Sequence, residues 1–525
     1  MFVLNRGSGR LLLRAALVVV SALALSLFSC APAEGPVEVS ADGALVIPSL
    51  DSEIRLRAYR PDPEFLLSWE QEGGGEVKVV LENITASTAV EVIPEEGEAA
   101  AYTVSSELPL SLVVTVEGDG RQRFRLSPQG KEAGEPPFFA VFGDSQGRND
   151  VLEKIIEEIN LAKVDFVICL GDLVASGTEE EYREFMETMA ALECPYYPVM
   201  GNHDVRGEGA EHYCSYLAPA EYRFDYGGFR FLFTDSSRMG YSREQLSRLE
   251  EELTGALPTF LFLHVPPLDP REKDHAFLDP EEARAFVELI SEPSRKVQAV
   301  FSGHIHMFHH RVFSGVHHIV SGGGGAALYA SATEGGYHHF ALCRLEAGEL
   351  QVEPVKVEAP SRSGDLAVTG PSGDLVFTAA ELAELAVLEQ ELEFQNRLEN
   401  YRGQGFYRGV PVSVLLEEAG GMKPGDILMV HALDGYAQAY AYENVYPESC
   451  GWEERQGQMA LAVEYEGMTL PEWAEGYRIA FFPEDGVYDN EDCALTSAEG
   501  QGWNIYESAG ARWVKTVIRL EVVAK

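Results

Sequence analysis

Basic residues are scarce in this sequence. Its 525 residues include 40 Lys and Arg but 84 Asp and Glu, which gives a formal net charge of −44 at pH 7. Such a charge repels nucleic-acid backbones and anionic membrane surfaces, so a general nucleic-acid binder is excluded. Hydrophobic residues make up 46% of the chain and charged residues 24%, as in ordinary folded proteins, so global disorder is excluded as well. At ~100–200 residues per domain, the length predicts roughly three domains.

Cysteines are also few, and no two of the seven have a C-x-x-C spacing. A zinc knuckle or a dithiol redox motif is therefore unsupported. Cys169 and Cys343 lie in strand-like apolar runs and are expected to be buried thiols. In an oxidising compartment two disulfides are conceivable: Cys450 with Cys493, and Cys194 with Cys214.

The N-terminal apolar run is too short for a permanent membrane helix. It extends from Ala15 to Phe28 after three arginines, whereas a membrane-spanning helix needs about 20 apolar residues. A basic start followed by a short apolar core is typical of an export signal. The end of the run, Leu27-Phe28-Ser29-Cys30, resembles a bacterial lipoprotein box. In that family the cysteine thiol receives a diacylglyceryl group and becomes the new N-terminus.

Residues 1–29 are therefore predicted to be a signal peptide, with Cys30 as the lipidation site. Acyl chains on Cys30 would hold the acidic protein at a membrane. The resemblance implies an exported, membrane-anchored lipoprotein that faces the periplasm or the cell exterior. Ordinary signal cleavage near Ala31-Pro32-Ala33 is the alternative.

The rest of the chain divides into three regions of different pattern, which predicts a multi-domain fold. Residues 31–135 contain short alternating stretches separated by Gly, Pro and acidic turns, which indicates an N-terminal β-sandwich. Residues 138–358 alternate buried strands with amphipathic helices, which indicates a central α/β domain. Residues 360–525 are predicted to be a C-terminal α+β domain with helices at 379–393 and 411–419.

Capping signals mark helices in the central region. Thr178 and Glu181 form a capping box that predicts a helix ending at Leu192. Asp279 followed by Pro280 predicts the start of another helix.

Five predicted strands of the central region each end in one or two residues able to bind a metal ion. These residues are Asp144, Asp172, Asn202 with His203, His264, and His304 with His306. Active sites of α/β folds gather at the carboxyl ends of strands, and a mixture of carboxylate, amide and imidazole suits two divalent ions. His304 and His306 can point to one side only if the backbone turns between them, which Gly303 permits.

The order GD, GD, GNHD, H and GHxH resembles the calcineurin-like metallophosphoesterase superfamily. The segments FLFTDSS and SGGGGAAL fit the same family. The resemblance implies a layered β-sandwich flanked by helices, and two divalent metal ions, Mn, Fe or Zn. It also implies hydrolysis of phosphate mono- or diesters, with a small phosphate ester as the substrate.

The resemblance implies a role for each of these residues. Asp172 bridges the two ions, and the other ligands divide between them: Asp144 and His306 at the first ion, and Asn202, His264 and His304 at the second. His203 stays unmetallated, contacts the substrate phosphate and assists departure of the leaving group, because a protonated imidazole can donate to the leaving oxygen. The neighbouring Asp204 could orient His203, but we expect it instead to be solvated in its loop.

Two residues near the first motif leave alternatives open. Gln146 occupies a place where the family commonly has histidine, and an amide oxygen is the weaker donor to a transition metal. The first site could therefore bind weakly, take a different ion or stay empty. Arg148 could clamp a substrate phosphate or lie solvated at the start of a helix.

The tail has a resemblance of its own. The segments YRGVPVSVLLEEAG (407–420), GYRIAFFP (476–483) and WVKTVIRLEVV (513–523) resemble the sulfite-oxidase-type molybdopterin-binding fold. In that family a cysteine thiolate binds molybdenum upstream of the YxGVP segment, but residues 392–406 contain no cysteine. Without a soft sulfur ligand, a molybdopterin cofactor is doubtful. The tail is interpreted as a degenerate binding or docking module.

Three functions follow from these observations. The leading one is an exported, lipid-anchored, metal-dependent phosphoesterase that uses a hydroxide activated by two metals. The alternative is a non-catalytic cell-surface binding protein on a degenerate phosphoesterase scaffold. A molybdopterin oxidoreductase is the third, which the missing cysteine disfavours.

Overall fold

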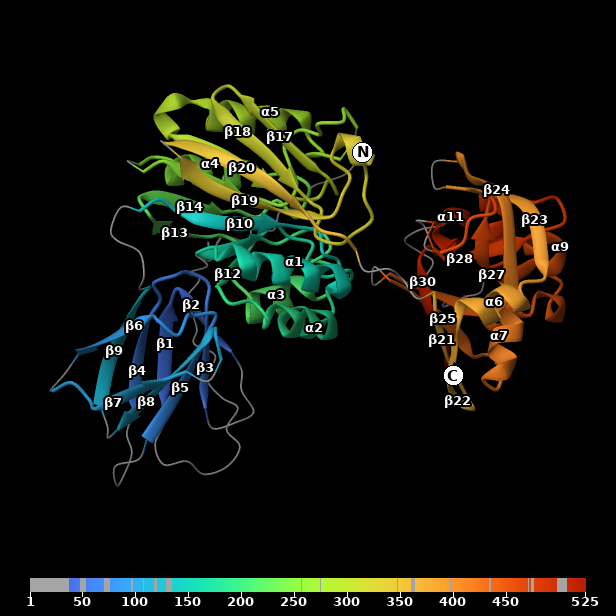
Figure 1. Ribbon diagram of the computed structural model, residues 1–525, viewed down its shortest axis with the longest axis horizontal. Helices are drawn as coiled ribbons and strands as arrows, with labels where there is room; N and C mark the ends of the chain where they lie inside the picture. Colours follow the sequence, from blue (N-terminus) through green and yellow to red (C-terminus); the bar gives the residue numbers. More distant parts are fainter. Residues whose placement is uncertain are drawn as a thin grey trace, which may run out of the picture.

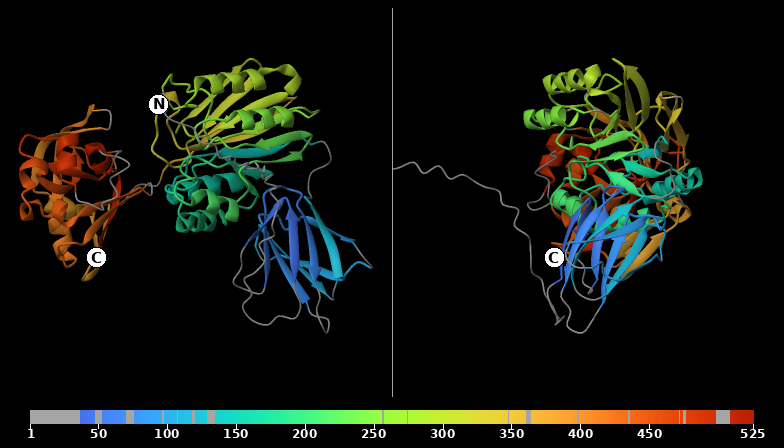
Figure 2. Two further views of the ribbon diagram at one scale, coloured as in Figure 1. Left: turned by 180° about the vertical axis from the view of Figure 1, so that it is seen from behind. Right: turned by 90° about the vertical axis from the view of Figure 1, so that its left-hand side faces the viewer.

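The computed structural model describes three bodies, each with its own apolar core (Figure 1, Figure 2). The described residues are 37–525 except 48–52, 70–75, 96–97, 107, 118–119, 129–134, 256, 274, 347, 360–363, 397–398, 434–435, 471, 474–475 and 498–507. The predicted signal peptide and Cys30 lie outside the described residues, so both stay predictions.

Two β-sheets that share one core form the N-terminal body. Strand β5 shows why the sequence folds this way: it buries Val77 and Val79 but exposes Lys78 between them, the two-residue period of a strand with one buried face. The first sheet, in spatial order, is β1 (Glu38–Asp42), β4 (Glu64–Trp69), β9 (Gly120–Ser127) and β6 (Ala89–Pro94). The second is β2 (Ala44–Ile47), β3 (Ile54–Ala58), β5 (Glu76–Glu82), β8 (Ser111–Glu117) and β7 (Tyr102–Ser105).

The middle body is also built on two sheets, with helices outside them. The five-stranded sheet has the order β12 (Tyr196–Pro198), β11 (Phe166–Cys169), β10 (Phe138–Phe142), β19 (His339–Glu346) and β20 (Glu349–Lys356). The six-stranded sheet has the order β13 (Tyr222–Tyr226), β14 (Phe229–Phe233), β15 (Thr259–Phe262), β16 (Val297–Ser302), β18 (Val316–Ser321) and β17 (Phe308–Phe313). The helices are α1 (Asn149–Ala162), α2 (Glu179–Met189), α3 (Gly209–Tyr216), α4 (Arg243–Glu252) and α5 (Pro280–Ser291).

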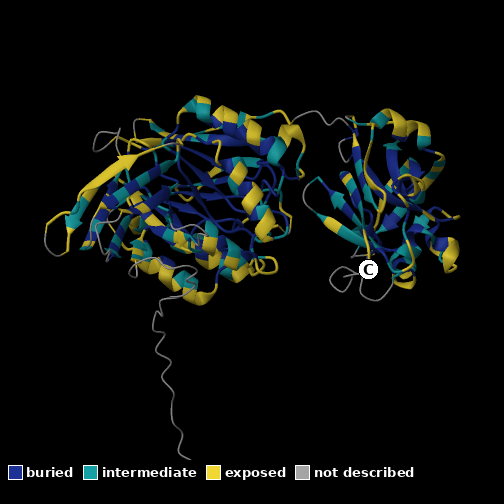
Figure 3. Ribbon diagram, turned by 90° about the horizontal axis from the view of Figure 1, so that it is seen from below, coloured by how far each residue is buried: buried dark blue, intermediate teal, exposed yellow. Residues whose placement is uncertain are grey.

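Aromatic side chains fill the space between these two sheets. Phe139 of β10 lies 5.4 Å from Phe231 of β14 and 6.3 Å from Phe262 of β15, measured between ring centroids. In β15, Phe260 and Phe262 point toward the other sheet. Leu261, between them, points to the opposite face and packs with residues of α4 and α5. The outer faces of the helices are exposed, whereas the strands between them are buried (Figure 3). The predicted α/β layering of this region is confirmed.

The helix starts predicted from capping residues are found in the structure. The Thr178 hydroxyl accepts from the Glu181 N–H, and the Glu181 carboxylate accepts from the Thr178 N–H. Asp279 caps α5 with Pro280 in its first turn. Helix α2 ends at Met189 rather than at Leu192, because a tight turn, with the Leu192 N–H on the Met189 carbonyl, directs Leu192 into the core.

The C-terminal body contains two further five-stranded sheets. The first has the order β22 (Gly373–Phe377), β21 (Leu366–Gly370), β30 (Val517–Val523), β25 (Ile427–Ala432) and β26 (Ala437–Ala441). The second has the order β28 (Arg478–Phe482), β27 (Gln458–Tyr465), β24 (Tyr401–Pro411), β23 (Leu388–Gln395) and β29 (Val487–Tyr488). Its helices are α6 (Ala379–Leu385), α7 (Val412–Glu418), α8 (Tyr442–Val445), α9 (Glu453–Gln456), α10 (Asn490–Leu495) and α11 (Ala509–Arg512).

The helix predicted for residues 379–393 is wrong beyond Leu385. Strand β23 begins at Leu388, and within it Leu392 and Phe394 are buried while the residues between them are not. This is the period of a strand, although the segment is rich in glutamate, which favours helices. Pairing with β24 along its length overrides that preference.

The two disulfides conceived from the sequence do not form. All six cysteines of the described residues are free, and Cys169 and Cys343 are buried as predicted. Within the same part of the chain, no helix is long and apolar enough to cross a bilayer.

Burial of histidine in the middle body makes its stability depend on pH. Burial lowers the pKa of His339 from 6.5 to about 4, and its ring contacts the Ser321 hydroxyl and the Tyr337 carbonyl. The unfolded chain therefore binds more protons than the folded chain between these two pKa values. The free energy of unfolding should decrease as the pH falls from about 6.5 to about 4, by up to about 3 kcal/mol for this residue.

The measurement is thermal unfolding of the native protein and of the His339→Gln variant between pH 7 and pH 4. The variant should lose stability less steeply over this range, because glutamine binds no proton. Parallel curves for the two proteins would contradict the assignment of this pH dependence to His339.

Candidate functional site

Parallel strands bring the predicted ligands to one edge of the middle body. Strands β10, β11 and β12 run parallel, as do β14, β15 and β16, so their carboxyl ends and the loops that follow lie together. The structure brings six of the predicted residues into contact: Asp144, Gln146, Asp172, Asn202, His264 and His306. His203 and His304 lie beside them.

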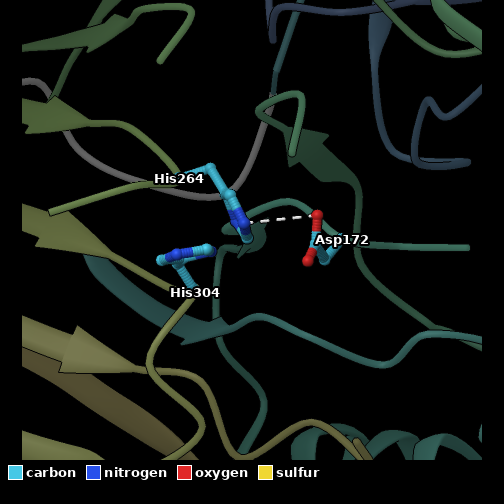
Figure 4. A group of neighbouring side chains, drawn as sticks. All are labelled: Asp172, His264 and His304. Carbon is cyan, nitrogen blue, oxygen red and sulfur yellow. Dashed lines mark ion pairs between the residues drawn. The ribbon is translucent and has the colours of Figure 1, made fainter. Parts of the chain in front are cut away.

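Asp172 lies at the centre of this cluster. It belongs to two groups whose ligand atoms all lie within 4.8 Å of one another, one with His264 and His304 and the other with Asp144 and His306. The His264 Nε2 atom lies 3.2 Å from Asp172 Oδ1 (Figure 4). A buried carboxylate shared by two groups of this kind can bridge two cations.

Several of these residues have left-handed backbone conformations. The φ angles are 65° at Asp144, 43° at Gln146, 51° at Asp172 and 65° at His304. Such angles are costly for residues with side chains and occur preferentially at functional sites. The turn between His304 and His306 therefore falls on His304 itself rather than on Gly303.

Glycines are required where the metal-site loops approach one another closely. A Cβ atom on Gly303 would lie 2.5 Å from Asp144 Oδ2, and one on Gly201 would lie 2.2 Å from Asp172 Oδ1. These glycines let the backbone pass directly behind the two carboxylates.

Backbone carbonyls orient two of the histidines. His264 Nδ1 donates to the Leu170 carbonyl at 2.7 Å, and His306 Nδ1 donates to the Ala327 carbonyl at 2.6 Å. In each ring this leaves Nε2 directed into the cluster, the usual arrangement for a histidine that binds a metal.

Burial and the carboxylates set the charge state of the cluster. Burial lowers the pKa of His304 to about 3, so its ring is neutral. Burial also opposes protonation of His264, but the Asp172 carboxylate outweighs that effect and raises the pKa of His264 to about 10. Burial raises the pKa of Asp144.

The donor set fits divalent metal ions. His304 Nε2 is buried and has no hydrogen-bond partner among the described residues, and a buried nitrogen of this kind requires a partner. The cluster supplies carboxylate, imidazole and amide groups within one buried region, which suits Mn, Fe or Zn.

Gln146 and Asn202 contact different members of the cluster. Gln146 Nε2 donates to Asp172 Oδ2 at 3.0 Å and lies 3.5 Å from His306 Nε2. The Asn202 amide oxygen lies 3.1 Å from His264 Nε2. Gln146 therefore lies beside Asp172 and His306, and Asn202 lies beside His264.

His203 lies at the rim of the cluster. Its Nε2 is 3.9 Å from Asp172 Oδ2, and its Nδ1 donates to the Ala175 carbonyl at 2.8 Å. Arg206 Nη2 donates to His203 Nε2 at 2.8 Å. Burial lowers the pKa of His203, so the ring accepts from Arg206 as a neutral imidazole.

The expectation that Asp204 is solvated in its loop is wrong. Asp204 is fully buried and accepts from the backbone N–H groups of Leu173, Val174 and Gly201. Burial raises its pKa to about 7. Asp204 thus joins the loop that carries Asp172 to the loop that carries His203, and its place as the last residue of GNHD was the only sequence signal for this role.

Arg148 does not extend into the cluster as a clamp. Its guanidinium makes two hydrogen bonds with Asp150 at 2.8 and 2.9 Å, and Nη1 donates to the Gly325 carbonyl at 3.3 Å. It is buried, so solvation at the helix start is also wrong. Arg148 fastens the glycine-rich turn after β18 to the start of α1.

Two further side chains near the cluster had no motif to reveal them. The Tyr329 ring stacks on His306 with centroids 4.0 Å apart. His275 lies 6.2 Å from His304 and 5.4 Å from Tyr329, measured between ring centroids. Tyr329 directly follows the SGGGGAAL segment, and His275 lies in the loop between β15 and α5 that carries His264.

Comparison with known proteins agrees with this geometry. Residues 139–308 match the family model of calcineurin-like phosphoesterases. The chain is 32% identical over 159 residues to the glycerophosphodiester phosphodiesterase GpdQ of Enterobacter lignolyticus, covering 27% of this chain and 56% of that protein. It is 31% identical over 172 residues to the 3′,5′-cyclic adenosine monophosphate phosphodiesterase CpdA of Haemophilus influenzae, covering 30% of this chain and 59% of that protein.

A solved structure similar to this chain is the purple acid phosphatase PPD1 of yellow lupin. The identity is 15%, the TM-score is 0.38, and the match covers 65% of this chain and 74% of that one. The chain spans a little over half the length of the two curated relatives.

The family match and the site together define the class. Residues 139–308 form a calcineurin-like phosphoesterase domain, and the two groups of Asp and His side chains within it could hold metal ions. The regions before and after these residues lie outside the match.

Replacing Asp172 with Asn should lower the metal content of both halves of the cluster, because the carboxylate belongs to both groups. His304→Ala should affect one half only. Elemental analysis should find about two first-row ions per chain in the native protein and about one in His304→Ala. His309→Ala, which alters a histidine of β17 outside both groups, is the matched control, and unchanged metal in Asp172→Asn would overturn the assignment.

Asp204→Ala should destabilise the protein by about 1–3 kcal/mol, because buried N–H groups lose their acceptor. Urea unfolding measures this change. Asp204→Asn keeps one acceptor oxygen, so its free energy of unfolding should lie between those of the native protein and the Asp204→Ala variant. An alanine variant as stable as the native protein would show that water replaces the carboxylate.

Proposed function

We propose that the protein is a metal-dependent phosphoesterase that hydrolyses small phosphodiesters at the cluster around Asp172. The observation that carries this proposal is that the buried Asp172 carboxylate belongs to both ligand groups. When bound, two ions in such a site generate a nucleophile from water at neutral pH and neutralise charge on the phosphoryl oxygens.

The proposed ligands follow the two groups. The first ion would be held by Asp144, Gln146 and His306, the second by Asn202, His264 and His304, and both by Asp172. The backbone N–H groups of His203 and His304 donate to Asp172 and Asp144 respectively. These bonds hold the carboxylates in place while their remaining lone pairs face the cluster.

His203 is proposed as the catalytic acid. The Ala175 carbonyl fixes the ring through Nδ1, which leaves Nε2 on the side of Asp172. Arg206 reaches the same Nε2 atom from a loop position that is exposed to solvent. A substrate phosphate would compete for the Arg206 guanidinium and so free Nε2 to take a proton from solvent. The resulting imidazolium would donate that proton to the leaving oxygen.

A diester suits this site better than a monoester. The two curated relatives are by name phosphodiesterases. A diester also carries less negative charge than a monoester, and the chain has a net charge of −44. The repulsion that the protein exerts on an approaching substrate is therefore smaller for a diester.

Export and lipid attachment complete the proposal. The basic start, the short apolar run and Cys30 support a lipoprotein that faces the periplasm or the cell exterior. The proposed mature chain comprises a sandwich (31–135), the phosphoesterase domain (138–358) and a binding module (360–525). The resemblance of 360–525 to molybdopterin-binding domains supports a binding role without molybdenum chemistry, since residues 392–406 have no cysteine.

A non-catalytic binding protein is the alternative, and Gln146 is the observation that favours it. Its amide nitrogen, not its oxygen, faces Asp172 and His306 in the structure. If that half of the cluster binds no ion, one ion alone would hold a phosphate ligand without activating water efficiently. Metal content and turnover together distinguish these two functions.

Replacing His203 with Ala should lower kcat for bis(p-nitrophenyl) phosphate by about 10²–10⁴-fold, because the proton donor is lost. Its metal content should stay unchanged. His212→Ala, which removes a histidine of the nearby helix α3, is the matched control. Full turnover in His203→Ala would overturn the role of His203, and no turnover in the native protein with one ion or none would favour the binding protein.

A further inference from the structure

A short segment after β18 contacts His306 at three points. The Ala327 carbonyl accepts from His306 Nδ1 at 2.6 Å, and the Tyr329 N–H donates to the His306 carbonyl at 3.1 Å. The Tyr329 ring stacks on the imidazole, with centroids 4.0 Å apart and planes inclined by 20°. The segment therefore fixes both the backbone and the ring of this histidine.

Arg271 holds the same tyrosine from the loop after β15. Its Nη1 donates to the Tyr329 carbonyl at 3.3 Å, and its Cζ lies 5.5 Å from the centroid of the Tyr329 ring. The same loop places the His275 ring edge-on to Tyr329, with centroids 5.4 Å apart. Tyr329 is 38% exposed, so contacts from this loop, rather than burial in a core, keep its ring on the imidazole.

A carboxylate keeps Arg271 in this position. Asp269 accepts from the Arg271 backbone N–H at 2.8 Å, and from Nε and Nη2 at 3.0 and 2.9 Å. The side chain of Asp269 is 2% exposed and that of Arg271 is 12% exposed, so this two-bonded pair is largely shielded from water. Because Asp269 occupies Nε and Nη2, Nη1 is directed to Tyr329.

His306 is the ligand for which such support matters most. In its group with Asp144 and Asp172 it is the only imidazole, whereas the other group contains two. Gln146 beside it offers only an amide, which is a weaker donor to a transition metal. The affinity of this half of the cluster for an ion therefore depends on how firmly His306 Nε2 is held in place.

We propose that Tyr329 is a positioning residue, which fixes His306 for the first ion. Arg271 acts one step further away, by holding Tyr329. The loop that carries Arg271 also carries His264, a member of the other group, so one loop supports a ligand in each half of the cluster. The inference rests on the proposed function, which places an ion in each half.

The test is equilibrium dialysis of the metal-free protein against Mn²⁺. Tyr329→Ala should bind one of its two ions about 10–100-fold more weakly than the native protein, because the support of the His306 ring is lost. The other ion should bind as before. Tyr329→Phe keeps the stacked ring, so both ions should bind with native affinity. Native affinities in Tyr329→Ala together with a raised KM would show that Tyr329 contacts the substrate instead, and would overturn the proposal.

A double variant shows whether Tyr329 acts through His306. If it does, Tyr329→Ala should weaken ion binding no further in a His306→Ala background, measured up to millimolar Mn²⁺, whereas independent losses would add. Equal losses in the two backgrounds, or weaker binding of both ions in Tyr329→Ala, would overturn the proposal. Arg271→Ala should weaken the same ion as Tyr329→Ala, and native affinity in this variant would refute the role of Arg271.

Tyr216→Ala is the matched control. It removes a tyrosine of α3 that stacks on His212, with centroids 6.4 Å apart, outside both ligand groups, and it should leave both affinities unchanged. Ion affinity also separates this proposal from the proposed function. Two bound ions without turnover of bis(p-nitrophenyl) phosphate would refute the hydrolase alone, whereas a native protein that binds fewer than two ions would overturn the role of Tyr329.

Discussion

The sharing of the Asp172 carboxylate is the constraint on which the rest of the middle body depends. To place one buried carboxylate against ligands from four other loops, the structure must bring the carboxyl ends of two separate sheets to one point. It does so with left-handed backbone at Asp172 and His304 and with glycine where a Cβ would collide with a carboxylate. The aromatic layer between the sheets fixes their separation, so the strained loops rest on a rigid support.

The parts of the fold that follow from local pattern could be predicted from the sequence. The cluster could be predicted because buried strands end in Asp, Asn or His, and parallel strands bring their carboxyl ends together. Capping residues such as Thr178 gave helix starts, because a cap is a local hydrogen bond. The C-terminal ends of helices were less predictable. Helix α2 ends before Leu192, because Leu192 packs into the core.

What could not be predicted depends on contacts between distant residues. Nothing in GNHD shows that Asp204 turns inward to accept hydrogen bonds from the N–H groups of another loop. Nothing near Arg148 shows that its guanidinium donates to the carbonyl of Gly325, 177 residues away. Residues 388–395 have the composition of a helix, and only the pairing with β24 makes them a strand. Tyr329 and His275 reach the cluster through loop conformations that leave no periodic trace in the sequence.

The bond pattern of Asn83 has a consequence for the autonomy of the phosphoesterase domain. Strand β12 is the last strand of its sheet, and the Asn83 amide meets its Tyr196 N–H and carbonyl as a neighbouring peptide group would. The sandwich thereby caps a strand edge that is otherwise open to association with another chain. A fragment that begins at β10 would lack Asn83, so the edge of β12 would be unpaired only a few residues before Asn202 and His203. The sandwich therefore protects the sheet edge nearest to these two residues.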